Sequence, residues 1–453
     1  MSESSMLTQP KFDRDAELDT LQAHVEASLS RAGSAGATAV EVSAHASQGL
    51  SVMVRMGQVD TLEHMQDRGV SVSVYIGRRK GQASSADLSQ QSVDNCVDKA
   101  LEIARFTQED PCNGLAAPEL LATEFPDLDT WHPASLDAQA AIERALACEQ
   151  AGRDDERISN SEGASFDAGL GLNVYGNSHG FIGRSAGTRY SQSCVLIAGK
   201  NSGMQRDYSY DSRRSLADLE PAEVTGKEAA RRTVRRLGAG QIKTGRMPIL
   251  FAPEVAKGII GHFVGAISGT ALYRNASFLK GKAGEQIFPA WLKLTERPHL
   301  LRGAASAAFD GDGVATRHHH VVSDGVLQNY LLSSYSARRL GLQSTGNAGG
   351  VRNLLLQPGG EGGDNPLKAM QNGLYVTEVM GQGVSMVTGD YSRGASGFTV
   401  VNGELAVPVD EVTIAGNLRD MFLGIVLTGS NIDTRGNIHS GALLISDMTV
   451  AGS

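Results

Sequence analysis

The sequence predicts an α+β fold, with an N-terminal α/β lobe layered on an antiparallel sheet and a C-terminal lobe that is mainly β and barrel-like. Apolar residues alternate with polar ones between residues 40 and 76, which indicates strands with one wet face. Asp-Gly and Asn-Gly pairs, which favour tight hairpins, join short apolar runs after residue 320. The chain has 53 glycines and only 5% aromatic residues, so turns and close backbone packing are favoured over a large aromatic core.

Residues 14–107 are predicted to form the N-terminal unit. Apolar residues recur at helical spacing from Leu18 to Leu29, and Gly33 follows as a helix stop. Three alternating runs come next, over residues 40–46, 50–56 and 70–76. A second helix is predicted through Val93 and Ala104, with Ser89 or Asp87 as its N-cap. The unit therefore reads as an antiparallel meander between two helices.

A middle unit is predicted over residues 108–238. It begins with a proline-rich connection that ends near residue 134, after which Ser135 is expected to cap a helix through Ala151. Short strands follow, and a second helix spans Glu220 to Leu237. Four arginines gather near the end of that helix, at positions 231, 232, 235 and 236. They suit a solvated helix end better than a phosphate or partner patch.

The C-terminal unit, residues 241–453, is organised around the stretch from Met247 to Thr270. An apolar run ending at Phe251 predicts a buried strand, and Pro253 offers a helix start. The helix ends in a run of small residues, so we expect another backbone or a ligand to approach it closely. Asp324-Gly325 and Asn402-Gly403 predict hairpins beyond it, and residues 334–340 a short helix.

Composition limits the classes of function. A net charge of −9 and a pI near 5.7 argue against general nucleic-acid binding. The longest apolar stretch, residues 259–273, is shorter than the roughly 20 residues that cross a bilayer. The first 19 residues lack the apolar core of a signal peptide, and the four cysteines show no CxxC pairing. We therefore expect a cytoplasmic protein without membrane association, whose thiols are reduced.

Three motifs match patterns that occur in catalytic or metal-binding sites. His318, His319 and His320 could bind zinc from one strand face, but no carboxylate or cysteine at ligand spacing accompanies them, which favours an exposed strand. Gly176-x-Ser178-x-Gly180 matches a nucleophile elbow, yet the sequence predicts a hairpin there rather than a strand–turn–helix. His262, alone on an apolar helix, is more typical of a hydrogen-bonded core residue than of a general base.

The segment 247–270 resembles the TldD/PmbA family, known as modulators of DNA gyrase, and specifically its PmbA (TldE) branch. The resemblance extends over roughly residues 20 to 450. In the TldD branch, a His-Glu-x-x-x-His helix supplies two zinc ligands and a general base, and a cysteine near the C-terminus supplies a third ligand. Here these positions fall on Gly261, His262, Ala266 and, in the segment Asn437–Gly441, Ser440. The resemblance therefore implies a zinc-peptidase scaffold without metal ligands in this chain.

Three glycine-rich segments also resemble the family, over residues 344–350, 380–385 and 388–394. They could line a cleft that holds an extended peptide by backbone hydrogen bonds, or they could be ordinary barrel-corner turns. Both interpretations remain open. Candidate substrate-binding residues are His262, Asp390, Tyr391 and Arg393.

The resemblance implies a non-catalytic subunit of a cytoplasmic heterodimer, in which a TldD-like partner holds zinc. The complex would hydrolyse unfolded or extended peptides, such as peptide-antibiotic precursors and antitoxins. One alternative is a metallopeptidase active in its own right through His262, His439 or residues 318–320. Another is a non-enzymatic protein that regulates gyrase or an RNA regulator. Whether the chain alone forms a homodimer is left open.

Overall fold

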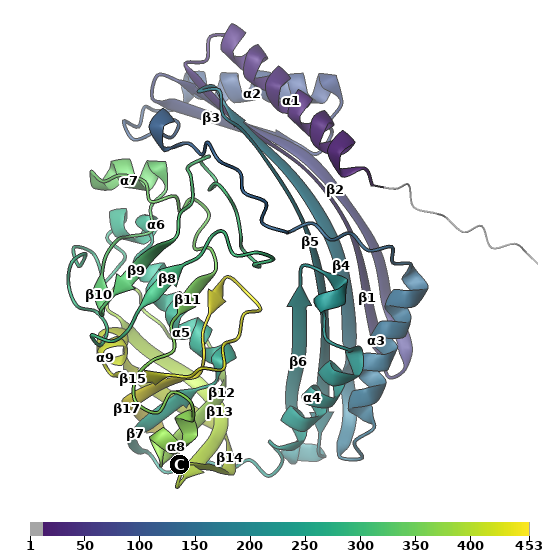
Figure 1. The fold of residues 1–453 in the computed structure, drawn as a ribbon, viewed down its shortest axis with the longest axis vertical. Helices are drawn as coiled ribbons and strands as arrows, with labels where there is room; N and C mark the ends of the chain where they lie inside the picture. The colour runs from purple at the N-terminus through teal and green to yellow at the C-terminus, as the bar shows by residue number, and fades with distance from the viewer. Residues whose placement is uncertain (1–11, 453) are drawn as a thin grey trace, which may run out of the picture. The chain divides into compact units, whose positions relative to one another are not determined.

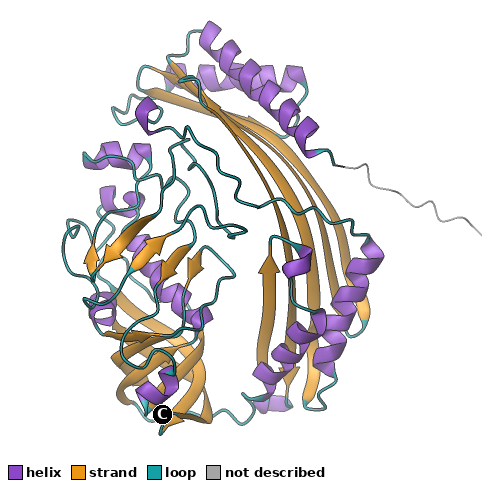
Figure 2. Ribbon diagram, viewed as in Figure 1, coloured by secondary structure: helices purple, strands orange, loops and turns teal. Residues whose placement is uncertain are grey.

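The computed structural model describes residues 12–452 and confirms the α+β class (Figures 1 and 2). The predicted absence of a signal peptide rests mostly on residues 1–11, which lie outside the described part. Contacts divide the chain into two compact units. One holds the described residues up to Gly49, Met65–Leu115 and Leu170–Gly187; the other holds Leu50–His64, Ala116–Gly169 and Thr188 onward. The division into 14–107, 108–238 and 241–453 stays a prediction.

A six-stranded sheet has the order β3-β2-β1-β4-β5-β6. Its strands are β1 (Ala39–Arg55), β2 (Gln58–Ile76), β3 (Arg79–Ser85), β4 (Ile158–Asn177), β5 (Ile182–Ala198) and β6 (Gln205–Arg213). The prediction of separate strands at 40–46 and 50–56 was wrong, because Ser47, Gln48 and Gly49 stay extended and join both runs into β1. Buried and partly exposed residues alternate along most of β1, as the period of two requires.

Helices α1 (Arg14–Ser34) and α2 (Gln90–Phe106) belong to the first unit, and both were predicted. Asp13 caps α1 by accepting hydrogen bonds from the backbone N–H groups of Asp15 and Ala16. Ser89 takes the N-cap position of α2 without a side-chain capping bond. A β-carbon at Gly81 of β3 would come within 2.0 Å of the Ala100 carbonyl oxygen, so only glycine permits this close helix–strand contact.

Helices α3 (Ala138–Arg153) and α4 (Ala222–Val234) pack together in the second unit. The cap of α3 is Asp137, which accepts from the Ala140 N–H at 2.7 Å, so the predicted cap at Ser135 was wrong. The carboxylate of Asp137 is one turn from Ala141, the first buried residue of α3. Three short 3₁₀ turns connect these elements, at Pro118–Leu120, Asn201–Gly203 and Leu216–Asp218.

A closed barrel forms the centre of the C-terminal region. Its strands are β7 (Gly245–Phe251), β12 (Gly373–Met380), β13 (Asp390–Val401), β14 (Glu404–Asn417) and β17 (Leu443–Ala451). The pairings run β14-β13-β12-β7-β17, and β17 returns to β14, so the ring closes. Only the β7–β12 pair is parallel. Strand β15 (Ile425–Thr428) attaches to β17, and Asn402-Gly403 makes the predicted hairpin with φ of 52° and 77°.

A five-stranded sheet has the order β10-β9-β8-β11-β16. Its strands are β8 (Leu294–Glu296), β9 (His319–Ser323), β10 (Val326–Leu327), β11 (Leu354–Leu356) and β16 (Ile438–His439). Asp324-Gly325 makes the predicted β9–β10 hairpin. Short helices complete the region: α6 (Gly269–Tyr273), α7 (Ser334–Leu340), α8 (Pro366–Met370) and α9 (Leu418–Leu423).

Helix α5 (Pro253–Ala266) contributes to the core shared by the barrel and the five-stranded sheet. Phe263 of α5 meets Phe288 and Phe422 edge-on, with ring centroids 4.9 and 5.8 Å away. All three rings are fully buried, and each such side chain stabilises the fold by about 1.5–3 kcal/mol. The orientation of α5 is therefore set by packing. Within residues 12–452, no helix is long and apolar enough to cross a membrane.

Candidate functional site

Strand β7 delivers the chain directly into α5. The strand is buried at its end, and Pro253 at the first helical position has the backbone angle that a helix start requires. One face of α5 is buried and carries Val255, Ile259 and Phe263. The other face is half-exposed and carries Lys257, Gly261, His262 and Gly265. The strand–helix unit predicted from residues 247–270 is therefore confirmed.

The small residues of α5 leave open space. A β-carbon at Gly258 would have no neighbour within 4 Å, and one at Gly261 would meet only the Ile438 side chain, at 4.0 Å. At Gly265 the nearest atom would be Cε of Met386, at 3.5 Å. No backbone of the described residues approaches these three glycines, but at the end of the small-residue run the Gly269 N–H donates to the Leu331 carbonyl oxygen at 2.9 Å, so the expected close approach is found there. The exposed face of α5 is unfilled rather than tightly packed.

The positions that resemble zinc ligands hold no suitable donor. Gly261 has no side chain, and Ala266 is buried in the apolar core. Ser440 is fully buried, and its hydroxyl donates to the Gly441 carbonyl oxygen at 2.8 Å. Ile438 packs against the Gly261 position, so β16 brings the segment that carries Ser440 beside α5. These residues do not fit a zinc ion.

His262 and Tyr391 lie together. Their ring centroids are 5.9 Å apart and the rings meet edge-on. Partial burial, reinforced by the positive charge of Arg393, lowers the pKa of His262, which favours the neutral imidazole. Burial raises the pKa of Tyr391 to about 12, and its hydroxyl is buried without a hydrogen-bond partner among residues 12–452. His262 makes no hydrogen bond to the described chain, and its expected role as a hydrogen-bonded core residue stays a prediction.

The other two predicted substrate-binding residues have local partners. Asp390 is exposed and accepts from Thr388 at 2.6 Å and from Asn417 at 3.2 Å, which fixes the turn before β13. Arg393 donates from Nε to the Met380 carbonyl oxygen at 3.1 Å. Their role in substrate binding stays a prediction.

His318 and His320 are exposed and their rings meet edge-on, with centroids 6.2 Å apart, as expected for one face of an exposed strand. His319 lies 3.7 Å from the Glu296 carboxylate, and His320 hydrogen-bonds the Thr295 hydroxyl. His439 is buried and contacts the Gly436 carbonyl oxygen at 3.0 Å, and burial lowers its pKa. Across the described chain, no three His, Cys, Asp or Glu side chains gather in a metal-binding arrangement. Gly176–Gly180 lies in the β4–β5 hairpin, as expected, rather than in a nucleophile elbow.

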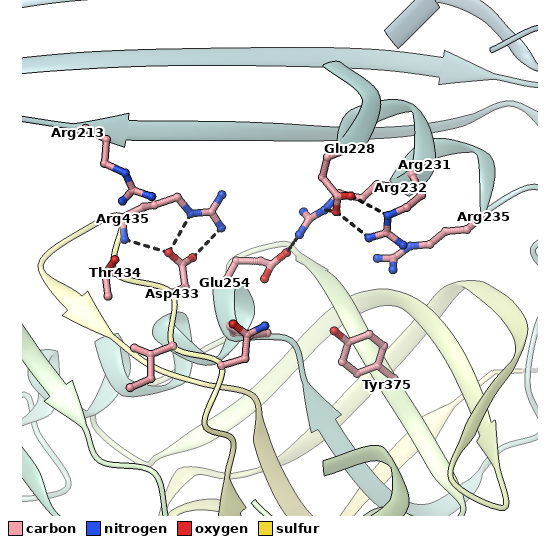
Figure 3. A pocket seen from close by; sticks show the side chains of 13 residues that line it. Arg213, Glu228, Arg231, Arg232, Arg235, Glu254, Tyr375, Asp433, Thr434 and Arg435 are labelled. Atoms are coloured by element: carbon pink, nitrogen blue, oxygen red, sulfur yellow. Dashed lines mark hydrogen bonds and ion pairs between the residues drawn. The ribbon is translucent and has the colours of Figure 1, made fainter. Parts of the chain in front are cut away.

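A cavity of about 360 Å³ opens at the N-terminal end of α5 (Figure 3). We call it the arginine cavity. Its charged lining consists of Arg213, Arg231, Arg232, Arg235, Arg435, Glu228, Glu254 and Asp433. Five arginines face three carboxylates, so the lining has a net charge of +2. This positive cavity contrasts with a chain whose net charge is −9.

The carboxylates of the arginine cavity are bound by arginines, as the dashed lines in Figure 3 show. Glu228 pairs with Arg231 at 2.7 Å and with Arg232 at 3.0 Å, and Arg232 also binds Glu254. Asp433 accepts a two-pronged hydrogen bond from Arg435, with both distances 2.9 Å. Arg235 has no carboxylate partner within the described chain; it lies over the Phe398 ring, 4.9 Å from its centroid. Burial, together with neighbouring Arg231, lowers the pKa of Arg235.

The four arginines at and just after the end of α4 were expected at a solvated helix end. Arg231 is 60% exposed, as expected, but the side chain of Arg232 is only 18% exposed and that of Arg236 only 8%, so the prediction was wrong for these two. Arg236 binds Glu378 at 2.6 Å and lies near Asp207 and Asp410. Sequence reasoning also missed Arg213, Asp433 and Arg435. Asp433 pairs with nearby Arg435 and Arg213 with nearby Asp211, so a charge pattern two residues apart was the available signal; their contacts with Lys257 and Tyr210, which come from distant segments, had none.

Comparison with known proteins supplies the family. Residues 40–104, 131–237 and 244–452 match family models for domain 1, the central domain and the C-terminal domain of PmbA/TldA metallopeptidases. Metalloprotease PmbA of Escherichia coli O157:H7 is 49% identical over 91% of this chain and 92% of its own length. A PmbA homologue of Haemophilus influenzae is 44% identical over 97% of both chains.

A solved structure agrees in fold. The crystal structure of a protein from Bacteroides thetaiotaomicron, described as a modulator of DNA gyrase, superposes with a TM-score of 0.90 and 27% identity. The match covers 95% of this chain and 99% of that one. The strand–helix unit, the barrel and the sequence similarity over more than 90% of the chain all indicate the same family. The chain belongs to the PmbA/TldD metallopeptidase family, on its PmbA (TldE) branch.

Proposed function

We propose that this chain is the non-catalytic PmbA/TldE-type subunit of a two-chain zinc metallopeptidase, and that a TldD-like partner holds the zinc. One observation carries the proposal. Helix α5 keeps its place between the barrel and β16, while the ligand positions hold a glycine, a buried alanine and a serine whose hydroxyl is already hydrogen-bonded. A scaffold that retains its packing without donor atoms fits a structural subunit better than an independent metal enzyme.

On this proposal the chain forms part of the wall of the substrate chamber in a cytoplasmic peptidase. The complex cleaves unfolded or extended peptides, as in maturation of peptide-antibiotic precursors and degradation of antitoxins. Walls around the zinc would exclude folded proteins, and binding a peptide in an extended form would lower the entropy cost of cleavage. The open face of α5, beside His262, is where such a peptide would pass. This placement is supported by the empty space around Gly258 and Gly261.

The proposal is tested by three peptidase assays, with this chain alone, a TldD-like protein alone and the two mixed. Peptide cleavage that appears only in the mixture, with stoichiometric zinc only in the partner, is the expected result. Size-exclusion chromatography of the same samples shows whether a heterodimer forms and whether the chain alone is a homodimer. A His262→Ala variant should raise the KM of the mixture but not abolish cleavage, because on this proposal His262 lies beside the peptide and is not a base.

Two other outcomes would overturn it. Stoichiometric zinc in the isolated chain, with cleavage lost on His262→Ala or His439→Ala, would identify a self-sufficient metallopeptidase. Failure to associate with a TldD-like protein, combined with tight binding to gyrase or an RNA regulator, would identify a regulatory binding protein. Zinc content is measured by elemental analysis, which does not depend on the choice of peptide substrate.

A further inference from the structure

A second cavity, of about 350 Å³, adjoins the arginine cavity. The two share Arg213 and Thr434 in their linings, so they lie side by side. The second cavity adds Arg189, Arg214 and Arg302 and a single carboxylate, Asp218. It also includes His439, the residue before Ser440. We call the two together the paired arginine cavities; they extend from the start of α5 to the segment that carries Ser440.

Three guanidinium groups in this lining lack a carboxylate partner among the described residues. Arg235 makes only the ring contact with Phe398. Arg189 donates from Nε to the Ser212 hydroxyl at 3.0 Å. Arg214 donates to three carbonyl oxygens, those of Thr188, Gly303 and Ala304. Neutral acceptors orient these cations without neutralising them, so their charge remains available to an anion.

The remaining charges hold the lining in place. Asp433 is fixed by Arg435 at 2.9 Å and by Lys257 of α5 at 2.6 Å. Arg435 also lies over the Tyr210 ring, 4.2 Å from its centroid, and donates to the Tyr210 carbonyl oxygen. These contacts connect α5, β6 and the 431–435 segment. The cavity walls are therefore preorganised before any ligand arrives.

We propose that the paired arginine cavities bind carboxylate groups of an extended peptide, and that acidic peptides are the preferred substrates. This rests on the proposed function and extends it by naming the substrate class. A guanidinium fork matches a carboxylate with two parallel hydrogen bonds, and the three uncompensated arginines are distributed along the lining rather than at one point. The carboxylate can come from Asp or Glu side chains or from a C-terminus.

Nucleic acid is a poorer fit to the same lining. A phosphate backbone carries a charge at every nucleotide, and Glu228, Glu254 and Asp433 would repel it along the cavity wall. A peptide can place its carboxylates at the uncompensated arginines and neutral residues opposite the carboxylates.

Fluorescence anisotropy with the full chain tests the proposal. The probes are a flexible labelled peptide with several glutamates and an amidated C-terminus, its all-glutamine counterpart, and the glutamine peptide with a free C-terminal carboxylate. We expect the glutamate peptide to bind about tenfold more tightly than its glutamine counterpart, and added salt to reduce the difference. If only the free C-terminus restores binding, the terminal carboxylate is the group recognised.

Variants locate the binding. Arg189→Gln combined with Arg235→Gln should remove the preference for glutamate, and each alone should reduce it. Arg246→Gln is the matched control, because Arg246 is a surface arginine paired with Asp447 and lies outside both cavities. Near-ultraviolet circular dichroism confirms that each variant is folded; Arg189→Gln changes an exposed side chain, so at least one informative variant is expected to keep its structure.

The proposal is overturned if the glutamate and glutamine peptides bind equally, if the double variant binds like the unchanged chain, or if a single-stranded oligonucleotide binds more tightly than the glutamate peptide. The peptidase assay separates this failure from failure of the proposed function. Cleavage of neutral peptides by the mixture without acidic preference rejects only the carboxylate inference. Acidic-peptide binding by the chain, with no cleavage in any mixture, rejects only the subunit assignment.

Discussion

Arg236 shows how a single buried charge is accommodated beside β6, β12 and β14. Its side chain is 8% exposed and donates to Glu378 at 2.6 Å, while Asp207 and Asp410 lie 3.8 and 3.9 Å away. Asp207 is itself buried, and burial raises the pKa of its carboxyl although Arg236 and Arg232 oppose the shift. One guanidinium is therefore shared by three carboxylates that come from distant segments.

Replacing Arg236 with Met should lower the free energy of unfolding by about 3 kcal/mol, because it leaves buried carboxylates without a counter-charge. Urea denaturation measures the loss. Arg246→Met is the matched control, since its partner Asp447 is exposed and a surface pair contributes at most about 1 kcal/mol. Equal losses in the two variants would contradict the argument.

Asp433 makes stability depend on pH. Burial alone would raise the pKa of its carboxyl, but hydrogen bonds from Arg435 and Lys257 hold that pKa well below the usual range. As pH falls below about 4, the unfolded chain takes up this proton before the folded chain does, and the stabilisation is lost. Its contribution is therefore complete above the unfolded pKa and declines in acid.

Asp433→Asn should thus cost about 3 kcal/mol near neutral pH, where a buried charge pair is broken. The difference from the unchanged chain should shrink as pH falls below about 4. Denaturation midpoints measured across this range test the sign. A difference that stays constant into acid would show that Asp433 acts through packing or neutral hydrogen bonds.

At the scale of elements, two helical glycines have opposite surroundings. A β-carbon on Gly226 of α4 would lie 1.9 Å from the Cys148 carbonyl oxygen of α3, while one on Gly258 of α5 would meet nothing within 4 Å. The first glycine permits two helices to touch backbone to backbone. The second only reduces helix propensity, which is consistent with a face kept open.

Gly226→Ala should therefore destabilise the chain by about 1–3 kcal/mol through overpacking. Gly258→Ala should stabilise it by about 0.5–1 kcal/mol, because alanine favours the helix and has room. The two variants make the same chemical change in two helices, so each serves as the control for the other in thermal unfolding. Changes of the same sign would reject the contrast.

Local elements were largely predictable because their signals lie within a few residues of each other. The spacing from Leu18 to Leu29 and the hairpin pairs Asp324-Gly325 and Asn402-Gly403 each placed an element correctly. The length of β1 was not predictable, because residues 47–49 interrupt the alternating apolar pattern in the sequence but stay extended in the structure. The burial of Arg232 and Arg236 was not predictable for a different reason: Glu254 and Glu378, which bind them, lie in later segments of the chain.

For the whole molecule, the family resemblance correctly predicted helix α5. It also identified Gly261, Ala266 and Ser440 as positions that lack zinc-binding side chains. Which distant strands pair with each other could not be predicted from the sequence. β7 and β12 are parallel neighbours although more than a hundred residues separate them, and no periodicity encodes that register. The paired arginine cavities depend on the same long-range assembly, because their walls combine β5, β6, α4, α5 and the 431–439 segment.

Barrel closure should govern which amide groups exchange most slowly. The end of β7 (Ile249–Phe251) and the start of β17 (Leu443–Ile445) are buried, as are Leu374 and Val376 of β12, whereas residues 58–68 of β2 are exposed along their whole length. Hydrogen exchange followed by mass spectrometry should give opening free energies near the global value for the three barrel strands, and at least about 2 kcal/mol lower for residues 58–68. Uniform protection would show that the two regions open together.

The β17 pairings also constrain the order of biosynthetic folding. β17 follows the other four ring strands along the chain and joins β7 to β14. A nascent chain can assemble β12, β13 and β14 early, but β7 and β14 each keep an unsatisfied edge until Leu443–Ala451 emerges from the ribosome. Exposed strand edges recruit other chains. Premature translation stops just before residue 443 would thus yield products that need chaperones or proteases to keep them from aggregating.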